Sequence, residues 1–476
     1  MNRPFLLFLI TALSLSCNKK EPTDENTTNT RGEHNTYFIK DVHIIPMTEG
    51  DEVIPHATVV ITDKKIVAIT DSVPEKATVI DGTGKWLIPG LIDMHVHNLA
   101  DINFSENYPT KGATMFTDTD RFMLLYVANG VTTVLELSGR VEHFGQRNEI
   151  VRGTALGPRI ALAMLIDGGT SGHSANTPEQ GRQTVRIAKA QGYDFIKVYS
   201  HLSADTYYAI VDEADNLNMK VIGHIPDVFE KSNLHEAFVP NFQMVAHAEE
   251  FAKKAKTFSE EEALEFARMA KKSGVWLTPT LTVMERMAQQ TVSLDSVHYL
   301  KSFKYVHPLM QNKWITSNNN FKNTSPEKTA RFKKLAEYNK VLVRAFNDTG
   351  VPIVAGTDAG SSGVVWGFSL HDELELLVEA GLTNQEALVS ATRLPAEWLG
   401  ISDMIGTIES GNFADLVLLD ANPLVDIKNA RAIHGVFFNG NWLDREDMDS
   451  MLSDLADWNT ARKGKEKYQW ENRRNY

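Results

Sequence analysis

The sequence predicts an α/β protein, in which a (β/α)8 TIM-like barrel carries a small β-sandwich that both ends of the chain build together. The first observation is that short apolar stretches alternate with helical patterns through the middle of the chain, as in βα units around a parallel sheet. The second is that turn-rich, alternating stretches flank that middle section on both sides. The third is that the sequence has no glycine-rich phosphate loop, which an open dinucleotide-binding sheet would carry.

The first 17 residues have the layout of a secretory signal peptide. Arg3 precedes an apolar run over residues 5–15, which is too short to span a bilayer as a helix. Cys17, the only cysteine of the chain, follows this run in a layout that resembles the lipobox of bacterial lipoproteins, which implies lipidation of Cys17. The alternative is an ordinary signal peptide cleaved near Ser16. We expect a lipid-anchored protein of the bacterial cell envelope, in the periplasm or at the outer membrane, with a secreted or soluble periplasmic protein as the alternative.

The expected anchor is followed by residues 18–36, a polar segment rich in Thr, Asn, Glu and Lys that we expect to be a disordered tether.

The formal net charge of the chain is −13, which argues against a nucleic acid or an anionic membrane bound through a basic surface. We therefore expect a small-molecule substrate as partner and a membrane contact only through Cys17. A homo-oligomer is left open.

The small β-sandwich is predicted from two separate segments, residues 37–88 and 401–445. In the first segment, alternating runs are separated by Asp63-Lys64-Lys65 and followed by a tight turn over residues 81–84, as in β-hairpins. The second segment has a similar pattern of short apolar runs and turns. The remaining residues, 446–476, form a polar tail that we expect to pack as a terminal helix.

The barrel is predicted over residues 89–400. Helical patterns over residues 178–191, 204–216 and 259–273 lie between apolar stretches of strand length. A long segment, residues 284–340, precedes the last strand, and we expect it to lie over the mouth of the barrel. The eight expected strands cover residues 87–97, 131–136, 159–164, 194–199, 220–224, 244–247, 275–280 and 352–358.

Polar side chains stand at the ends of five of these strands. They are His95 and His97 on the first strand, Lys197 on the fourth, His224 on the fifth, His247 on the sixth and Asp358 on the eighth. The carboxyl ends of barrel strands meet on one face, where converging imidazoles suit a transition metal such as zinc. Each residue alone has a structural alternative, such as a hydrogen-bonded histidine, a phosphate-binding lysine or a helix-capping aspartate. Four histidines together favour a metal site.

These residues and several motifs resemble the amidohydrolase superfamily over residues 37–444. The motifs are IPGLIDMHVH, GYDFIKVY, AGTDAG, EAGLTNQEAL and ADLVLLDANPL. They are most similar to the branch of imidazolonepropionase-like proteins and metal-dependent Xaa-Pro and related dipeptidases. The resemblance implies a metal-dependent amidohydrolase that acts on carbon–nitrogen bonds.

The resemblance also implies two divalent metal ions, expected to be zinc, bridged by a carboxylated Lys197. One ion would take His95, His97, Lys197 and Asp358, and the other would take His224, His247 and the same Lys197. A hydroxide bridging the ions would be the nucleophile, and Asp358 would act as general base and then as general acid. Burial would lower the pKa of Lys197, so that its neutral amine can react with CO2. In this resemblance, imidazolonepropionase corresponds to a site with one metal ion and without this lysine. The presence of Lys197 therefore favours a peptidase with two metal ions.

Substrate contacts are predicted at two residues. Tyr199 lies two residues beyond Lys197 on the same strand face, so its hydroxyl is a candidate substrate contact, with packing at the rim as the alternative. His173, in the loop GGTSGHSANTP, is similar to a substrate-contacting histidine of related dipeptidases, although this loop departs from the usual glycine-rich form. His371 follows the eighth strand at the start of a helix, where a structural role is expected.

We therefore expect hydrolysis of an amide bond in a small substrate, either a dipeptide or an N-acyl amino acid. An alternative is a hydrolase of cyclic amides, imides, lactones or phosphoesters with the same metal centre. An alternative from another class is a non-catalytic solute-binding lipoprotein. Such a protein would be expected to lose metal ligands, whereas all six are present in this sequence.

Overall fold

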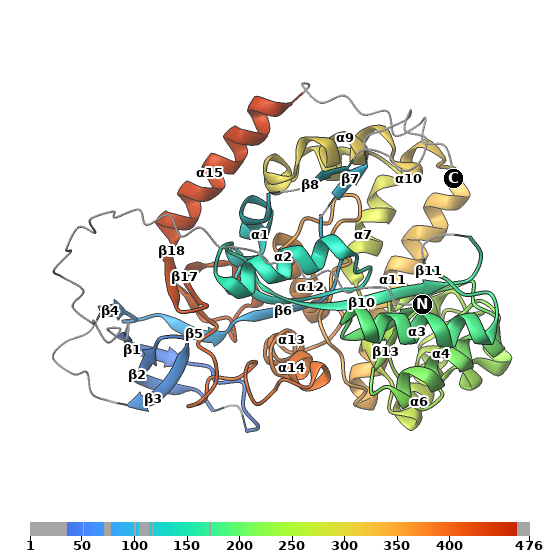
Figure 1. Ribbon diagram of the computed structural model, residues 1–476, viewed down its shortest axis with the longest axis horizontal. Helices are drawn as coiled ribbons and strands as arrows, with labels where there is room; N and C mark the ends of the chain where they lie inside the picture. The colour runs from blue at the N-terminus through green and yellow to red at the C-terminus, as the bar shows by residue number, and fades with distance from the viewer. Residues whose placement is uncertain are drawn as a thin grey trace, which may run out of the picture. The chain divides into compact units, whose positions relative to one another are not determined.

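Parallel strands in the middle of the chain form a barrel in the computed structural model, which describes residues 36–50, 52–70, 78–99, 101–103, 114–116, 118–170 and 173–463 (Figure 1). Seven strands pair in the order β15, β14, β13, β12, β10, β9, β6, with β11 beside β10. Their bounds are β6 Leu91–Val96, β9 Val131–Glu136, β10 Arg159–Asp167, β11 His173–Ser174, β12 Phe195–Val198, β13 Val221–Gly223, β14 Phe242–Ala246 and β15 Trp276–Thr278. These strands confirm seven of the eight expected barrel positions.

The eighth position is filled by the extended segment 352–359, which is not a regular strand. On one side, Val354 N donates to Leu277 O of β15 at 2.9 Å. On the other side, His97 N donates to Ala359 O at 2.8 Å, next to β6. Regular pairing is interrupted because Asp358 has a left-handed backbone, with φ +58°. The barrel therefore closes as predicted, although the segment 352–359 is joined to its neighbours by isolated β-bridges and not by a continuous ladder.

Helices connect the barrel strands at the predicted places. The three predicted helical patterns appear as α3 Pro178–Gln191, α4 Ala204–Asn216 and α6 Glu260–Ser273. Each begins after a Ser or Thr whose side chain accepts a backbone N–H in the first turn, which stabilises the helix start. The other connecting helices are α1 Thr119–Val127, α2 Val141–Arg152, α5 Glu249–Ala252, α12 Phe368–Glu379, α13 Asn384–Ser390 and α14 Arg393–Leu399.

Both ends of the described chain contribute strands to a second sheet, with the order β18, β17, β16, β5, β1, β2, β3 and with β4 beside β1. In Figure 1 the blue strands of the first segment continue into the red strands near the C-terminus. The strands are β1 Thr36–Ile44, β2 Ile54–Thr62, β3 Lys65–Thr70, β4 Thr78–Asp81, β5 Trp86–Pro89, β16 Leu416–Leu419, β17 Ile433–Phe438 and β18 Asn441–Asp444. The β unit built from two distant segments is therefore confirmed. Some of its buried side chains form an apolar cluster of their own, and others join the core that includes the barrel.

The segment before the eighth barrel position is helical. It comprises α7 Leu281–Gln290, α8 Asp295–His298, α9 Pro308–Thr316, α10 Asn319–Lys322 and α11 Pro326–Thr349. We call residues 284–340 the insertion. A short two-stranded sheet, β7 Asp101–Asn103 and β8 Thr114–Phe116, also leaves the barrel after β6.

The predictions for the two ends of the chain concern a terminal helix, a signal peptide with Cys17 and a tether. The expected terminal helix is present as α15 Arg445–Arg462, whereas residues 464–476 lie outside the described residues. The expected signal peptide, Cys17 and all of the tether except Thr36 also lie outside them, so lipidation and the envelope location stay predictions. Within the described part of the chain, none of the helices combines the length and the apolar character needed to cross a membrane.

Candidate metal centre

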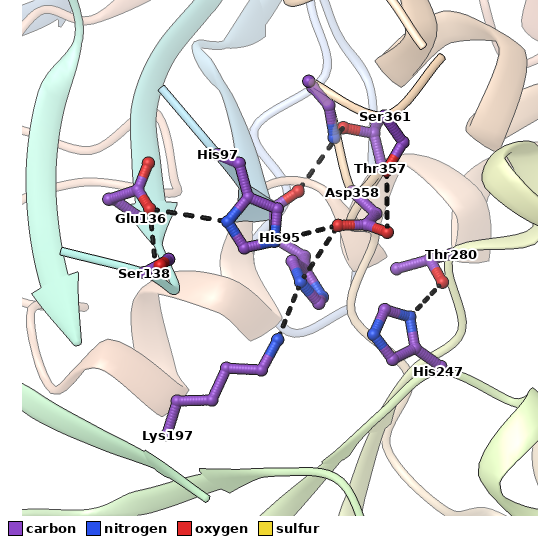
Figure 2. A network of polar contacts seen from close by, with 12 residues as sticks. His95, His97, Glu136, Ser138, Lys197, His247, Thr280, Thr357, Asp358 and Ser361 are labelled. Carbon is purple, nitrogen blue, oxygen red and sulfur yellow. Dashed lines mark hydrogen bonds and ion pairs between the residues drawn. The ribbon is translucent and has the colours of Figure 1, made fainter. Parts of the chain in front are cut away.

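The side chains predicted from the strand ends lie together in one cluster. Figure 2 shows five of the six, namely His95, His97, Lys197, His247 and Asp358. Lys197 Nζ is 3.1 Å from His95 Nε2. The ring centroids of His95 and His247 are 4.6 Å apart, and those of His247 and His224 are 4.9 Å apart. Four of the predicted residues, from four different strand ends, are thus in direct contact.

Asp358 lies beside both His95, in β6, and His97, which directly follows β6. Its Oδ1 lies 3.0 Å from His97 Nε2 and 3.4 Å from His95 Nε2. One ligand atom from each of these three side chains falls within 4.8 Å of the other two. Two imidazoles and a carboxylate at this spacing suit a single divalent ion.

The backbone directs these side chains inward through unusual conformations. Asp358, His247 and Thr280 have positive φ angles of +58°, +77° and +50°. Residues other than glycine rarely adopt this region, and such strain is concentrated at functional sites. Thr357, next to Asp358, donates from its Oγ1 to Asp93 Oδ2 at 2.7 Å and from its backbone N to Asp93 Oδ1 at 3.0 Å. The buried Asp93 therefore holds the turn that carries Asp358 in place.

The loop that follows Asp358 passes directly against His97. Gly360 has φ +107°, and a Cβ there would lie 2.7 Å from His97 O. Trp366 Nε1 donates to the same oxygen at 2.9 Å. Only glycine fits this close approach without displacing His97.

Glu136 is a site residue that the sequence analysis missed. It is the last residue of β9, it is fully buried, and its Oε1 lies 3.6 Å from His97 Nδ1. Its carboxylate also accepts hydrogen bonds from Ser138 N, at 2.7 Å, and from Asn98 N. A carboxylate on the outer nitrogen of a metal-binding histidine orients the ring and makes it a stronger ligand. The only sequence signal for it is an acidic residue at the end of an otherwise apolar strand.

The protonation states of the cluster follow from burial and from these contacts. Burial alone would lower the pKa of His97, but its contacts with Asp358 and Glu136 raise it to about 9. Burial alone would raise the pKa of Asp358, but His97 lowers it to about 2. Burial lowers the pKa of Lys197 to about 8 and holds the pKa of His95 well below its usual range. At neutral pH Asp358 is therefore an anion and His95 is a neutral imidazole able to bind a metal, whereas His97 is protonated and has to release its proton when a metal binds.

The donor atoms of the cluster fit divalent metal ions. His224 Nε2 is buried and has no hydrogen-bond partner among the described residues. Buried polar atoms are nearly always partnered, and this nitrogen belongs to a ring that packs against His247, so it fits a ligand of a metal in the cluster. His224 Nδ1 lies 2.9 Å from Ser200 Oγ, and His247 Nδ1 lies 2.8 Å from Thr280 Oγ1. One nitrogen of each ring is thus oriented by the protein.

The three other predicted residues lie in different surroundings. The ring of Tyr199 packs against His224 with centroids 3.9 Å apart, and Lys197 Nζ lies 5.7 Å from its centroid. His173, on β11, is exposed, and no hydrogen bond joins it to the cluster within the described part of the chain. His371, in α12, is buried with Nε2 3.0 Å from Asn129 O, as the structural role expected for it requires. The structure thus brings Tyr199 to the cluster, whereas it does not bring His173 or His371 there.

The insertion covers this end of the barrel. Residues of α9 and α10 line a cavity of about 360 Å³ together with His97 and the loop 360–362. This confirms the expected position of the insertion over the barrel mouth.

The model of the Amidohydrolase family matches residues 86–443. The imidazolonepropionase of Maricaulis maris (strain MCS10) is 34% identical over 116 residues, which are 23% of this chain and 28% of that protein. The imidazolonepropionase of Thermoplasma volcanium is 30% identical over 102 residues, which are 21% of this chain and 25% of that protein. The matched segments thus span about a quarter of these relatives.

Solved structures of similar fold cover most of the chain. A Xaa-Pro dipeptidase with methionine bound in its active site has a TM-score of 0.66 at 22% identity, covering 86% of this chain and 100% of that one. A bottromycin amidohydrolase has a TM-score of 0.69 at 22% identity, covering 89% and 90%. The ochratoxinase of A. niger has a TM-score of 0.64 at 21% identity, covering 87% and 96%. At these identities the likeness shows the fold.

Proposed function

Since the chain belongs to the amidohydrolase family, we propose that it hydrolyses an amide bond in a dipeptide or an N-acyl amino acid with divalent metal ions. The observation that carries this proposal is the cluster of four histidines, Lys197 and Asp358 at the barrel mouth. The Xaa-Pro dipeptidase and the bottromycin amidohydrolase among the structures of similar fold support a substrate with a carbon–nitrogen bond.

Two groups of residues would hold the metal ions. His95, His97 and Asp358 would hold one ion, and His224 and His247 would hold the other, with Lys197 between the two groups. When bound, the ions, expected to be zinc, would activate water at neutral pH and polarise the carbonyl of the substrate.

Lys197 would serve as the bridging ligand after reaction with CO2. Its buried amine has a pKa of about 8, so a sizeable fraction is neutral near pH 7 to 8. The nitrogen lone pair of the neutral amine would form a bond to the carbon of CO2 as one C=O π bond opens, and the proton released from the nitrogen would pass to water, which yields an anionic carbamate. This change removes a positive charge that would repel cations and adds two oxygen ligands.

Asp358 would carry the proton of the reaction. Its low pKa keeps it ionised, so it can accept a proton from the attacking water. It can then donate this proton to the nitrogen of the leaving amine. Ser361 Oγ, 3.2 Å from Asp358 Oδ2, holds the carboxylate in position during both transfers.

A substrate screen with controlled metal content tests the proposal. We expect zinc-loaded protein to hydrolyse members of a library of dipeptides and N-acyl amino acids, and a chelator to abolish the activity until zinc is restored. Turnover confined to lactones, cyclic imides or phosphoesters would favour the alternative hydrolase. Ligand binding without turnover would favour a solute-binding protein.

Glu136→Gln tests the support of His97. We expect the affinity for the first metal ion to fall by roughly 10- to 100-fold, because the outer nitrogen of His97 loses its anionic partner. Competition with a chromophoric chelator measures this affinity. Glu179→Gln, an exposed change in α3, is the matched control and should keep the native value. Native metal affinity in Glu136→Gln would contradict the role assigned to Glu136.

A further inference from the structure

A polar cavity lies between the insertion and the metal centre. We call it the insertion pocket. Its volume is about 360 Å³, which is in the range of sites for small ligands. It is lined by α9, α10 and the loop after Asp358, including His97, Lys313, Asn319, Asn320, Ser361 and Ser362.

The insertion pocket shares a wall with the metal centre. His97 lines the pocket, and its Nε2 is 3.0 Å from Asp358 Oδ1. Ser361 also lines it, and its Oγ is 3.2 Å from Asp358 Oδ2. Figure 2 shows His97 and Ser361 on either side of the Asp358 carboxylate. A small substrate whose amide lies at the metal centre can therefore reach into the pocket with one end.

Hydrogen bonds fix the walls of the insertion pocket. Asn318 Nδ2 donates to Gln290 Oε1 at 2.7 Å and to Ser362 Oγ at 3.0 Å. Gln290 Nε2 donates to Ser362 O at 2.7 Å, and Trp314 Nε1 donates to Gly360 O at 3.3 Å. These bonds join the insertion to the loop that follows Asp358. A pocket whose walls are already ordered binds its ligand at a lower entropic cost.

The lining of the insertion pocket favours an anion. Among the described residues that line it, Lys313 in the last turn of α9 carries the positive charge, and there is no aspartate or glutamate. The other polar side chains there include hydroxyls and amides, which can donate hydrogen bonds. The lack of acidic side chains among the described lining residues stands out in a chain with a net charge of −13.

We propose that the insertion pocket binds the free carboxylate of the leaving amino acid, through Lys313 and the side-chain amides of Asn319 and Asn320. Dipeptides and N-acyl amino acids both carry this carboxylate next to the scissile amide, so the inference rests on the proposed function and specifies its substrate class. The enzyme then selects substrates with a free terminal carboxylate over those in which it is amidated.

Lys313→Met tests this selectivity with pairs of N-acetyl amino acids and their C-terminal amides. One charge-assisted hydrogen bond corresponds to a rise in KM of roughly tenfold to a hundredfold for the free acids, with kcat little changed. The amides should keep their native KM. Lys313→Arg should restore much of the preference for free acids, because it retains the charge. Lys322→Met, in α10 but outside the pocket lining, is the matched control.

Calorimetry on the metal-loaded protein separates this inference from the proposed function. Native protein should bind N-acetyl amino acids more tightly than their amides, and Lys313→Met should bind both equally, even if no amide is hydrolysed. Turnover of free acids and amides with equal KM would overturn the pocket and leave the proposed function standing. Equal binding of acids and amides by the native protein would also overturn the assignment of the insertion pocket as a carboxylate site.

Discussion

Replacing Lys197 by alanine is expected to abolish turnover and to reduce the bound metal from about two ions per chain to one or fewer. The reason is that Lys197 is buried against His95, at the point where the two groups of histidines meet, and alanine lacks the amine that forms the carbamate. Elemental analysis of the purified variant measures the metal content, and the dipeptide assay measures turnover. Lys333→Ala, an exposed change in α11, should behave as the native protein does.

Dependence on CO2 gives a second measurement of the same prediction. Native apoprotein reloaded with zinc should recover activity faster when bicarbonate is present, because the carbamate must form before both ions are held. Lys197→Ala should show no such dependence. Full metal content together with full activity in Lys197→Ala would mean that the carbamate bridge is wrong.

Asp358→Asn is expected to lower kcat by roughly 10²- to 10⁴-fold, which is the usual contribution of a general acid–base group. An amide cannot accept the proton of water, although it still fills the space beside His97 and Ser361. Metal content has to be measured alongside kcat, because Asp358 is also a proposed ligand. At equal metal loading, a kcat near the native value would exclude Asp358 as the proton carrier. Asp348→Asn, an exposed change in α11, is the control.

The sequence predicted the side chains at the strand ends because two local patterns coincide there. A buried strand is visible as an apolar run, and a histidine or aspartate at its end is visible in the same stretch, as in the run that ends with His95 and His97. The eighth strand is the exception. Its residues stand where expected, but the left-handed turn at Asp358 prevents a regular ladder, and no local pattern shows this turn.

The residues that support the cluster could not be predicted in the same way. Glu136 and Asp93 are buried acids within apolar strands, and their importance comes from partners distant in the sequence, such as Thr357. The insertion pocket depends on contacts such as that between Asn318 and Ser362, which no local periodicity reveals. The strand face shared with Lys197 predicted that Tyr199 would point toward the cluster, and its ring packs against His224, whereas no periodicity places the loop with His173.

The small sheet that joins both ends of the chain sets an order for folding. β5 pairs with β16, so its partner strand is synthesised only after the whole barrel sequence has been made. Until then, the apolar side chains of β1, β2 and β5 lack part of their buried cluster. Such long-range pairing is slow, and apolar strands left waiting are prone to aggregate. The nascent N-terminal strands are therefore the segment of this protein that most needs protection by a chaperone during synthesis.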